Sequence, residues 1–168
     1  MRTLKSISKV LLVAFSLAIA VSCDNDDDNG GGGGGGNGVY LRAKVNGQNW
    51  SNSSLVEPSA TLNMGILNIL ASNNSGDAFN IQIPNFTGEG TYNNGNNDLM
   101  AGYINYMDMG SVGQFTSYTS VRGEGQVIVT EVTETHIKGT FTATAPENIE
   151  NPVQSVTITN GEFRIALQ

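Results

Sequence analysis

The chain of 168 residues has one cysteine, one histidine and one tryptophan. A lone cysteine, Cys23, excludes an intramolecular disulfide, and one cysteine with one histidine is too few for a zinc site made of those ligands. No Gly-x-Ser-x-Gly motif accompanies His136, so a serine nucleophile beside it is not indicated. We interpret His136 as an exposed strand histidine, and we expect no metal, no cofactor and no enzymatic activity.

The sequence also lacks an apolar run long enough to span a bilayer, which takes about 20 residues. Its longest such run extends from Val10 to Val21 and is broken by Ser16. Because Arg2, Lys5 and Lys9 precede this run, the pattern predicts a secretory signal peptide over residues 1–22.

The residues that end this segment, Leu17-Ala18-Ile19-Ala20-Val21-Ser22-Cys23, resemble the lipobox of bacterial lipoproteins. The resemblance implies that Cys23 is lipidated and becomes the new N-terminus. Two or more acyl chains make anchoring stable, whereas one chain gives only marginal membrane binding. We therefore expect a lipid-anchored protein of the outer membrane, exposed at the cell surface, with a periplasm-facing location as the alternative.

Residues 23–38 combine four aspartates with a run of glycines, and they offer no apolar group to bury. This composition predicts a disordered tether. An EF-hand calcium loop does not fit, because the position of the bidentate glutamate is taken by Gly35. Acidic residues directly after the lipidated cysteine instead resemble the surface-export signal of Bacteroidota lipoproteins.

Basic residues are few. Residues 1–22 hold three of the eight basic residues and none of the fifteen acidic ones, so the rest of the chain has a net charge of −10. Without the four tether aspartates, residues 39–168 carry −6. Such an acidic domain is not expected to bind nucleic acid or to adhere electrostatically to anionic lipid.

No stretch of ten residues in the 39–168 region shows the apolar spacing of a helix. Short alternating runs separated by turn residues predict instead a single all-β domain, an antiparallel meander folded as a β-sandwich, with a flattened β-barrel as the alternative. The expected strands are Val39–Val45, Ser59–Asn63, Ile66–Ser72, Ala78–Ile83, Gly90–Tyr92, Leu99–Met107, Gln114–Tyr118, Gly125–Val132, Thr135–Ala145, Val153–Thr159 and Glu162–Leu167. Trp50, just after the Asn46-Gly47 turn, is expected to anchor the core.

Four features of the chain belong together. They are the lipoprotein start, Ala43-Lys44-Val45-Asn46-Gly47-Gln48-Asn49-Trp50, Gly125-Gln126-Val127-Ile128-Val129-Thr130 leading to Lys138-Gly139-Thr140-Phe141, and the closing Val156-Thr157-Ile158-Thr159-Asn160-Gly161-Glu162-Phe163. Together they resemble an uncharacterised family of small Bacteroidota cell-envelope lipoproteins. The resemblance covers most of residues 39–168 and implies an all-β envelope domain. It implies no catalytic residue, because the family has no established activity.

Aromatic and amide side chains gather in the middle of the chain, and we select five of them as candidate ligand-binding residues: Tyr92, Asn94, Tyr103, Tyr106 and Tyr118. Sugars bind to aromatic faces and to amide groups, so a glycan is a candidate ligand and an envelope protein a candidate partner. The same residues also serve as core edges and turns.

The sequence thus favours a non-enzymatic binding or interaction module. One alternative is a carbohydrate-binding accessory lipoprotein of a nutrient-uptake system, and another is a structural subunit. A third is a carboxylate-dependent hydrolase that uses Glu131 with Glu134 or Glu147 with Glu150.

Overall fold

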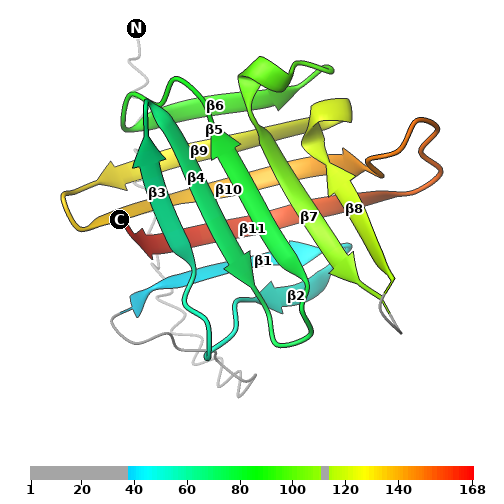
Figure 1. Ribbon diagram of the computed structural model, residues 1–168, viewed down its shortest axis with the longest axis horizontal. Helices are drawn as coiled ribbons and strands as arrows, with labels where there is room; N and C mark the ends of the chain where they lie inside the picture. The colour runs from blue at the N-terminus through cyan, green and yellow to red at the C-terminus, as the bar shows by residue number, and fades with distance from the viewer. Residues whose placement is uncertain (1–37, 111–113) are drawn as a thin grey trace, which may run out of the picture. The chain divides into compact units, whose positions relative to one another are not determined.

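The computed structural model describes residues 38–110 and 114–168 (Figure 1). The predicted signal peptide, Cys23 and almost all of the predicted tether lie outside these residues. Within the described residues, no helix is long and apolar enough to cross a membrane.

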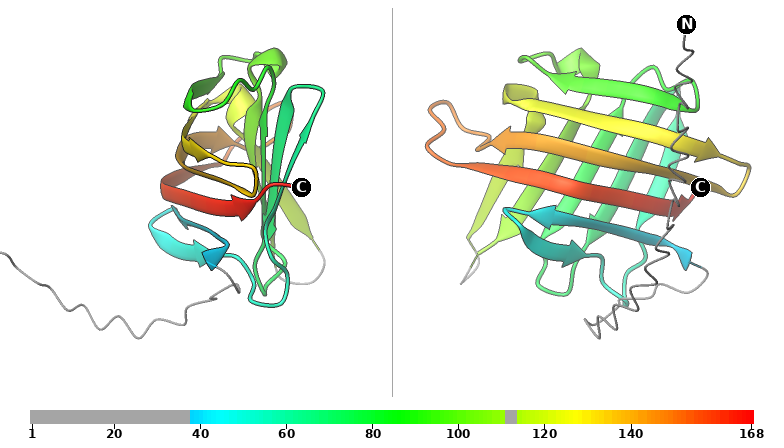
Figure 2. Two further views of the ribbon diagram at one scale, coloured as in Figure 1. Left: turned by 90° about the vertical axis from the view of Figure 1, so that its left-hand side faces the viewer. Right: turned by 180° about the vertical axis from the view of Figure 1, so that it is seen from behind.

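The described chain folds into two antiparallel sheets that pack face to face (Figure 2). In spatial order, sheet A contains β2 (Gln48–Ser51), β1 (Tyr40–Val45), β11 (Ser155–Ala166), β10 (His136–Pro146), β9 (Glu124–Val132) and β6 (Gly90–Gly95). Sheet B contains β3 (Ser59–Asn63), β4 (Ile66–Ser72), β5 (Ala78–Ile83), β7 (Tyr103–Met109) and β8 (Phe115–Thr119). The predicted β-sandwich is confirmed, and the flattened barrel is wrong because the two sheets do not close on each other.

The two sheets cross at a large angle in Figure 1, and the core fills the space between them. Alternate residues point inward from both sheets; for example, β10 alternates strictly between buried and exposed positions from Ile137 to Ala145. Phe79 of sheet B lies at the centre, fully buried, with its ring centroid 4.7 Å from that of Trp50 and 5.4 Å from that of Phe141 in sheet A. Trp50 is therefore a core anchor, as expected, and these rings join the two sheets.

The last two predicted strands form one continuous strand, β11. The Asn160-Gly161 pair between them is a bulge, where the register between β10 and β11 shifts beyond Phe141. Asn160 adopts the left-handed conformation, with φ of 51°. Gly161 is required because a Cβ there would lie 2.4 Å from the carbonyl oxygen of Phe141. The bulge increases the local twist of sheet A.

The simple meander is wrong, because the chain changes sheets several times. β1 pairs with β11, and β6 pairs with β9, although each pair is distant in sequence. The crossings from β5 to β6, from β6 to β7 and from β8 to β9 each join one sheet to the other. The last two crossings contain the short 3₁₀ helices η2 (Leu99–Ala101) and η3 (Ser120–Arg122).

Two predicted boundaries are also wrong, and one strand was missed. Asn93 and Asn94, beyond the predicted strand end at Tyr92, continue β6 because they pair with β9. The segment expected to start a strand at Leu99 begins instead with η2, since the Asp98 carboxylate caps it by accepting a hydrogen bond from the Met100 amide. β2 was not expected as a strand, but Trp50 pairs with Ala43 of β1.

Candidate functional site

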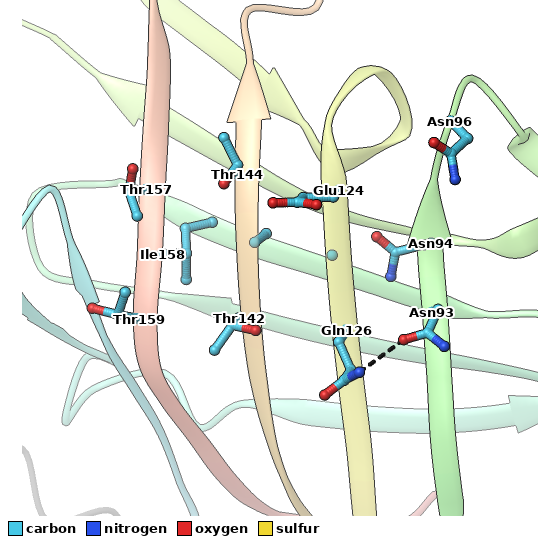
Figure 3. A pocket seen from close by; sticks show the side chains of 12 residues that line it. Asn93, Asn94, Asn96, Glu124, Gln126, Thr142, Thr144, Thr157, Ile158 and Thr159 are labelled. Carbon is cyan, nitrogen blue, oxygen red and sulfur yellow. Dashed lines mark hydrogen bonds between the residues drawn. The ribbon is translucent and has the colours of Figure 1, made fainter.

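A concavity of about 460 Å³ lies on the outer face of sheet A (Figure 3). We call it the sheet A concavity. Seven of its polar side chains come from four neighbouring strands: Asn93 of β6, Glu124 and Gln126 of β9, Thr142 and Thr144 of β10, and Thr157 and Thr159 of β11. These seven are exposed except Gln126, which is half-buried; the buried Asn94 and the exposed Asn96 complete the polar lining.

Strand register places these side chains in two rows. Thr144 lies opposite Thr157 on one side and Glu124 on the other, and this sets the first row. Thr142 lies opposite Gln126, which in turn lies opposite Asn93, and this sets the second row. Since strands are about 4.8 Å apart and side chains on one face repeat every 7 Å or so, the rows cover roughly 14 Å by 7 Å. This area accommodates one or two sugar rings.

Part of this surface is ordered before any ligand arrives. The Gln126 amide nitrogen donates a hydrogen bond of 2.8 Å to the Asn93 side-chain oxygen, as the dashed line in Figure 3 shows. Gly125, between the outward-pointing Glu124 and Gln126, faces the core, where a Cβ would lie 2.3 Å from the buried Asn94 Oδ1 atom. It therefore presents only backbone to the floor of the concavity, and the hydroxyls and amides stand around it.

The chemistry of the lining is hydrogen bonding. Threonine hydroxyls both donate and accept, and the Asn and Gln amides offer separate donors and acceptors. Glu124 is the one carboxylate among the lining residues, so the carboxylate pair of a glycosidase is not assembled there. The described residues also contain no group of three or more His, Cys, Asp or Glu side chains arranged to hold a metal.

A second concavity, of about 570 Å³, lies at the same end of the sandwich, beside β7 and β8. We call it the sheet B concavity. It is lined by Asn97, Leu99, Tyr103, Asn105, Thr119, Val121, Arg122 and Asn148. It thus combines an aromatic ring, amides and a cation, whereas the sheet A concavity has hydroxyls, amides and an anion.

Ser120 of η3 lies between the two concavities and connects the sheets. Its side chain is fully buried, and its hydroxyl donates to the Asn94 Oδ1 atom of sheet A. The same hydroxyl accepts a 2.8 Å hydrogen bond from the Ile104 backbone amide of sheet B. The pairing of β7 with β8 ends where Asn105 lies opposite Thr119. The Ile104 amide of β7 lies just beyond that point, and the Ser120 hydroxyl provides its acceptor.

The five predicted ligand-binding residues do not form one site. Tyr106 and Tyr118 are buried in the core, 6% and 5% exposed, with ring centroids 6.3 Å apart. Burial raises the pKa of both phenols above the usual tyrosine value, most strongly for Tyr106, and nearby carboxylates raise it further. Their role as aromatic platforms on the surface is wrong, because the core covers the ring faces.

Tyr92 and Asn94 also have structural contacts. The Tyr92 ring stacks on Phe86 with centroids 5.6 Å apart, and its hydroxyl donates to the Gly88 carbonyl. Asn94 is buried and accepts the Ser120 hydrogen bond, although it borders the sheet A concavity. Of the five, Tyr103 is the one whose aromatic side chain lines a concavity.

His136 and the glutamate pairs have structural partners as well. His136 is half-buried rather than exposed, and its Nε2 atom lies 2.7 Å from Glu131 Oε1, while Nδ1 lies 2.9 Å from the Thr133 hydroxyl. This triad-like chain closes the β9–β10 turn, where the Thr133 oxygen also accepts from the His136 backbone amide. Glu147, a member of the second candidate pair, is buried and accepts a hydrogen bond from the Val153 amide.

The threonines of the sheet A concavity were not identified from the sequence. The alternation of polar and apolar residues puts Thr142 and Thr144 on the polar face of β10, but it does not reveal which residues of β9, β11 and β6 stand beside them. That information lies in the register across four strands, including the bulge at Asn160.

Comparison with known proteins gives one match. A family model described as a domain of unknown function (DUF6252) matches residues 37–165. No curated protein and no solved structure matches the chain significantly.

Proposed function

Since the chain belongs to the DUF6252 family, whose description gives no function, we propose from its own surface that it is a non-enzymatic binding domain for a polyhydroxylated ligand. The proposed ligand is a glycan held in the sheet A concavity, and Cys23 anchors the protein to the outer membrane by lipid. The observation that supports this proposal is the lining of the concavity, where four strands present threonine hydroxyls, amides and one carboxylate around a backbone floor.

The lining favours hydroxyl-rich ligands over apolar ones. Each sugar hydroxyl is both a donor and an acceptor, and the threonine hydroxyls and side-chain amides of the lining also offer both, while the Glu124 carboxylate accepts. The concavity contains no aromatic side chain, so recognition there depends on hydrogen bonds rather than on ring stacking. Because each such bond has a modest net value, about 0.5–1.5 kcal/mol, we expect weak binding that is strengthened by several contacts.

A glycan array probed with the full chain carrying Cys23→Ser tests this proposal. A bound glycan is then titrated against the double variant Thr142→Val/Thr144→Val, which removes two hydroxyls with little change in shape. We expect the dissociation constant to rise about tenfold, which corresponds to roughly 1.4 kcal/mol. The matched control is Thr91→Val/Thr140→Val, on the same outer face but outside the concavity.

Two results would refute the proposed ligand class. One is an array on which no glycan binds. The other is a bound glycan whose affinity falls equally in the concavity variant and in its matched control.

The lipid anchor is tested independently in cells. We expect radiolabelled palmitate to be incorporated into the wild-type chain and to be lost completely in Cys23→Ser, with the variant leaving the membrane fraction. Label that persists in the variant would show that Cys23 is not the lipidated residue.

A further inference from the structure

Arg122, in the sheet B concavity, is fixed in position but has no acidic partner. Its Nη1 atom donates to the backbone carbonyls of Ile149 at 2.5 Å and Glu150 at 3.5 Å, in the loop between β10 and β11. Among the described residues, no carboxylate lies within ion-pair distance of its guanidinium. The remaining donors, on Nε and Nη2, form part of the planar fork that suits a carboxylate.

Tyr103 supplies an aromatic ring to the same concavity. It is half-buried on the outer face of sheet B, opposite Gln82 in the register of β5 and β7. The ring is stacked on none of the aromatic residues that the structure describes, in contrast to Tyr92, Tyr106 and Tyr118. The ring lines the concavity without an aromatic partner, so a sugar ring that enters there would meet it.

Asn105, next to Tyr103 on the same face, has an unmet hydrogen-bond requirement. Its Oδ1 atom is buried without a donor, and so is the Oδ1 atom of Asn80, which lies directly opposite. A buried acceptor without a donor costs about 1–3 kcal/mol. If the Asn105 side chain rotated toward the concavity, its Oδ1 atom would accept a hydrogen bond from a ligand hydroxyl there. This bond would remove the cost for Asn105, one of the two unpaired acceptors.

From these three observations, we propose that the sheet B concavity is a second binding site, for a sugar that carries a carboxylate. The carboxylate pairs with Arg122, the ring packs on Tyr103, and hydroxyls bind to Asn105 and to the amides of Asn97 and Asn148 at the rim. This site is separate from the sheet A concavity, so it stands or falls independently of the function proposed above.

Charge also restricts the ligand. Residues 39–168 carry a net charge of −6, so a highly charged anion such as a polyphosphate is repelled. A single carboxylate is repelled least, and the short-range contact with Arg122 is enough to select it. A uronic acid has this charge together with the hydroxyls that the amides need.

Calorimetric titration of the full chain carrying Cys23→Ser with digalacturonic acid, which has one carboxylate on each ring, tests the proposal. Its dimethyl ester, in which both carboxylates are masked, is the uncharged comparison. We expect the acid to bind at least tenfold more tightly than the ester. Arg122→Gln should abolish this preference, and Arg122→Lys, which keeps the charge but loses the fork, should reduce it. Tyr103→Ala should weaken acid and ester alike.

Two controls separate this site from other effects. Lys138→Gln removes an exposed positive charge on sheet A, outside both concavities, and should leave the preference unchanged. Thr142→Val/Thr144→Val should leave it unchanged as well, so a failure of the sheet A proposal is distinguishable. If Arg122→Gln loosens the loop that it holds, the wild-type chain still gives an answer, because its Arg122 Nε–H resonance should shift when digalacturonic acid is added.

The proposal is overturned if acid and ester bind equally or not at all, if Lys138→Gln has the same effect as Arg122→Gln, or if the Arg122 resonance does not move. It is also overturned if a tripeptide with a free C-terminus displaces digalacturonic acid at lower concentration than the sugar itself requires. That result would assign the concavity to peptide carboxylates.

Discussion

Replacing Ser120 by alanine should weaken the domain far more than the loss of one oxygen atom suggests. The hydroxyl donates to Asn94 in sheet A and accepts from the Ile104 amide in sheet B, and it is fully buried. Alanine keeps the Cβ, so almost no cavity forms. The variant instead leaves two buried polar groups without partners, one in each sheet.

The magnitude follows from those two groups. An unsatisfied buried donor or acceptor costs about 1–3 kcal/mol. We expect Ser120→Ala to lower the free energy of unfolding by about 2–5 kcal/mol, a large part of the 5–15 kcal/mol typical of a domain. Ser120 is small and lies in the connection between β8 and β9 rather than in a sheet. The loss of apolar burial alone would therefore not predict such a large decrease in stability.

Urea unfolding followed by the fluorescence of Trp50, the one tryptophan of the chain, measures the change. Thr140→Ala, at an exposed position of β10, is the control and should shift stability by less than about 0.5 kcal/mol. A double-mutant cycle with Asn94→Ala should show strong coupling, since the two residues share a hydrogen bond. A loss below about 0.5 kcal/mol for Ser120→Ala would refute this reasoning.

Three further predictions concern the core and the floor of the sheet A concavity. Burial raises the pKa of Tyr106, and Asp77 and Asp108 add to the shift. The folded state therefore retains a proton that the unfolded state loses near pH 10, so the free energy of unfolding should fall as the pH rises above that value. Urea unfolding at a series of alkaline pH values should show a smaller fall for Tyr106→Phe, and an equal fall would contradict this. Gly125→Ala should lower the free energy of unfolding by roughly 1–3 kcal/mol, because the new Cβ would meet Asn94. An unchanged midpoint of thermal unfolding would show that there is room for a methyl group beside Asn94. Trp50→Phe should lower the free energy of unfolding by less than the roughly 3–5 kcal/mol of a Trp→Ala change, because it also removes the buried indole nitrogen, which has no hydrogen-bond partner. A calorimetric loss of the full amount, about 3–5 kcal/mol, would contradict this.

Much of the fold was predictable because the alternation of apolar residues is regular. The bounds expected for Ser59–Asn63, Ile66–Ser72 and Ala78–Ile83 are those of β3, β4 and β5. Strand predictions were wrong where a polar segment is a strand because of its pairing with neighbouring strands and not because of alternating apolar residues. β6 is rich in asparagine and glycine and is a strand because β9 lies beside it.

The candidate site was less predictable for a related reason. Composition identified tyrosines and amides, but the same residue types are buried in the core, as Tyr106 is, or line a concavity, as Tyr103 does. Which of these applies depends on which face of β7 each residue occupies and on what packs against that face. The threonine array depends on the register between four strands, and no single segment of the sequence encodes it.

The chain enters its described part at Gly38, next to the row that joins Tyr40, Arg164 and Lys138. The row of Thr144 and Thr157 lies six residues further along β10, about 20 Å away at the rise of a strand. The strands of sheet A therefore hold the sheet A concavity at the end of that sheet opposite Gly38. A ligand bound there would be separated by folded structure from the point where the described chain begins.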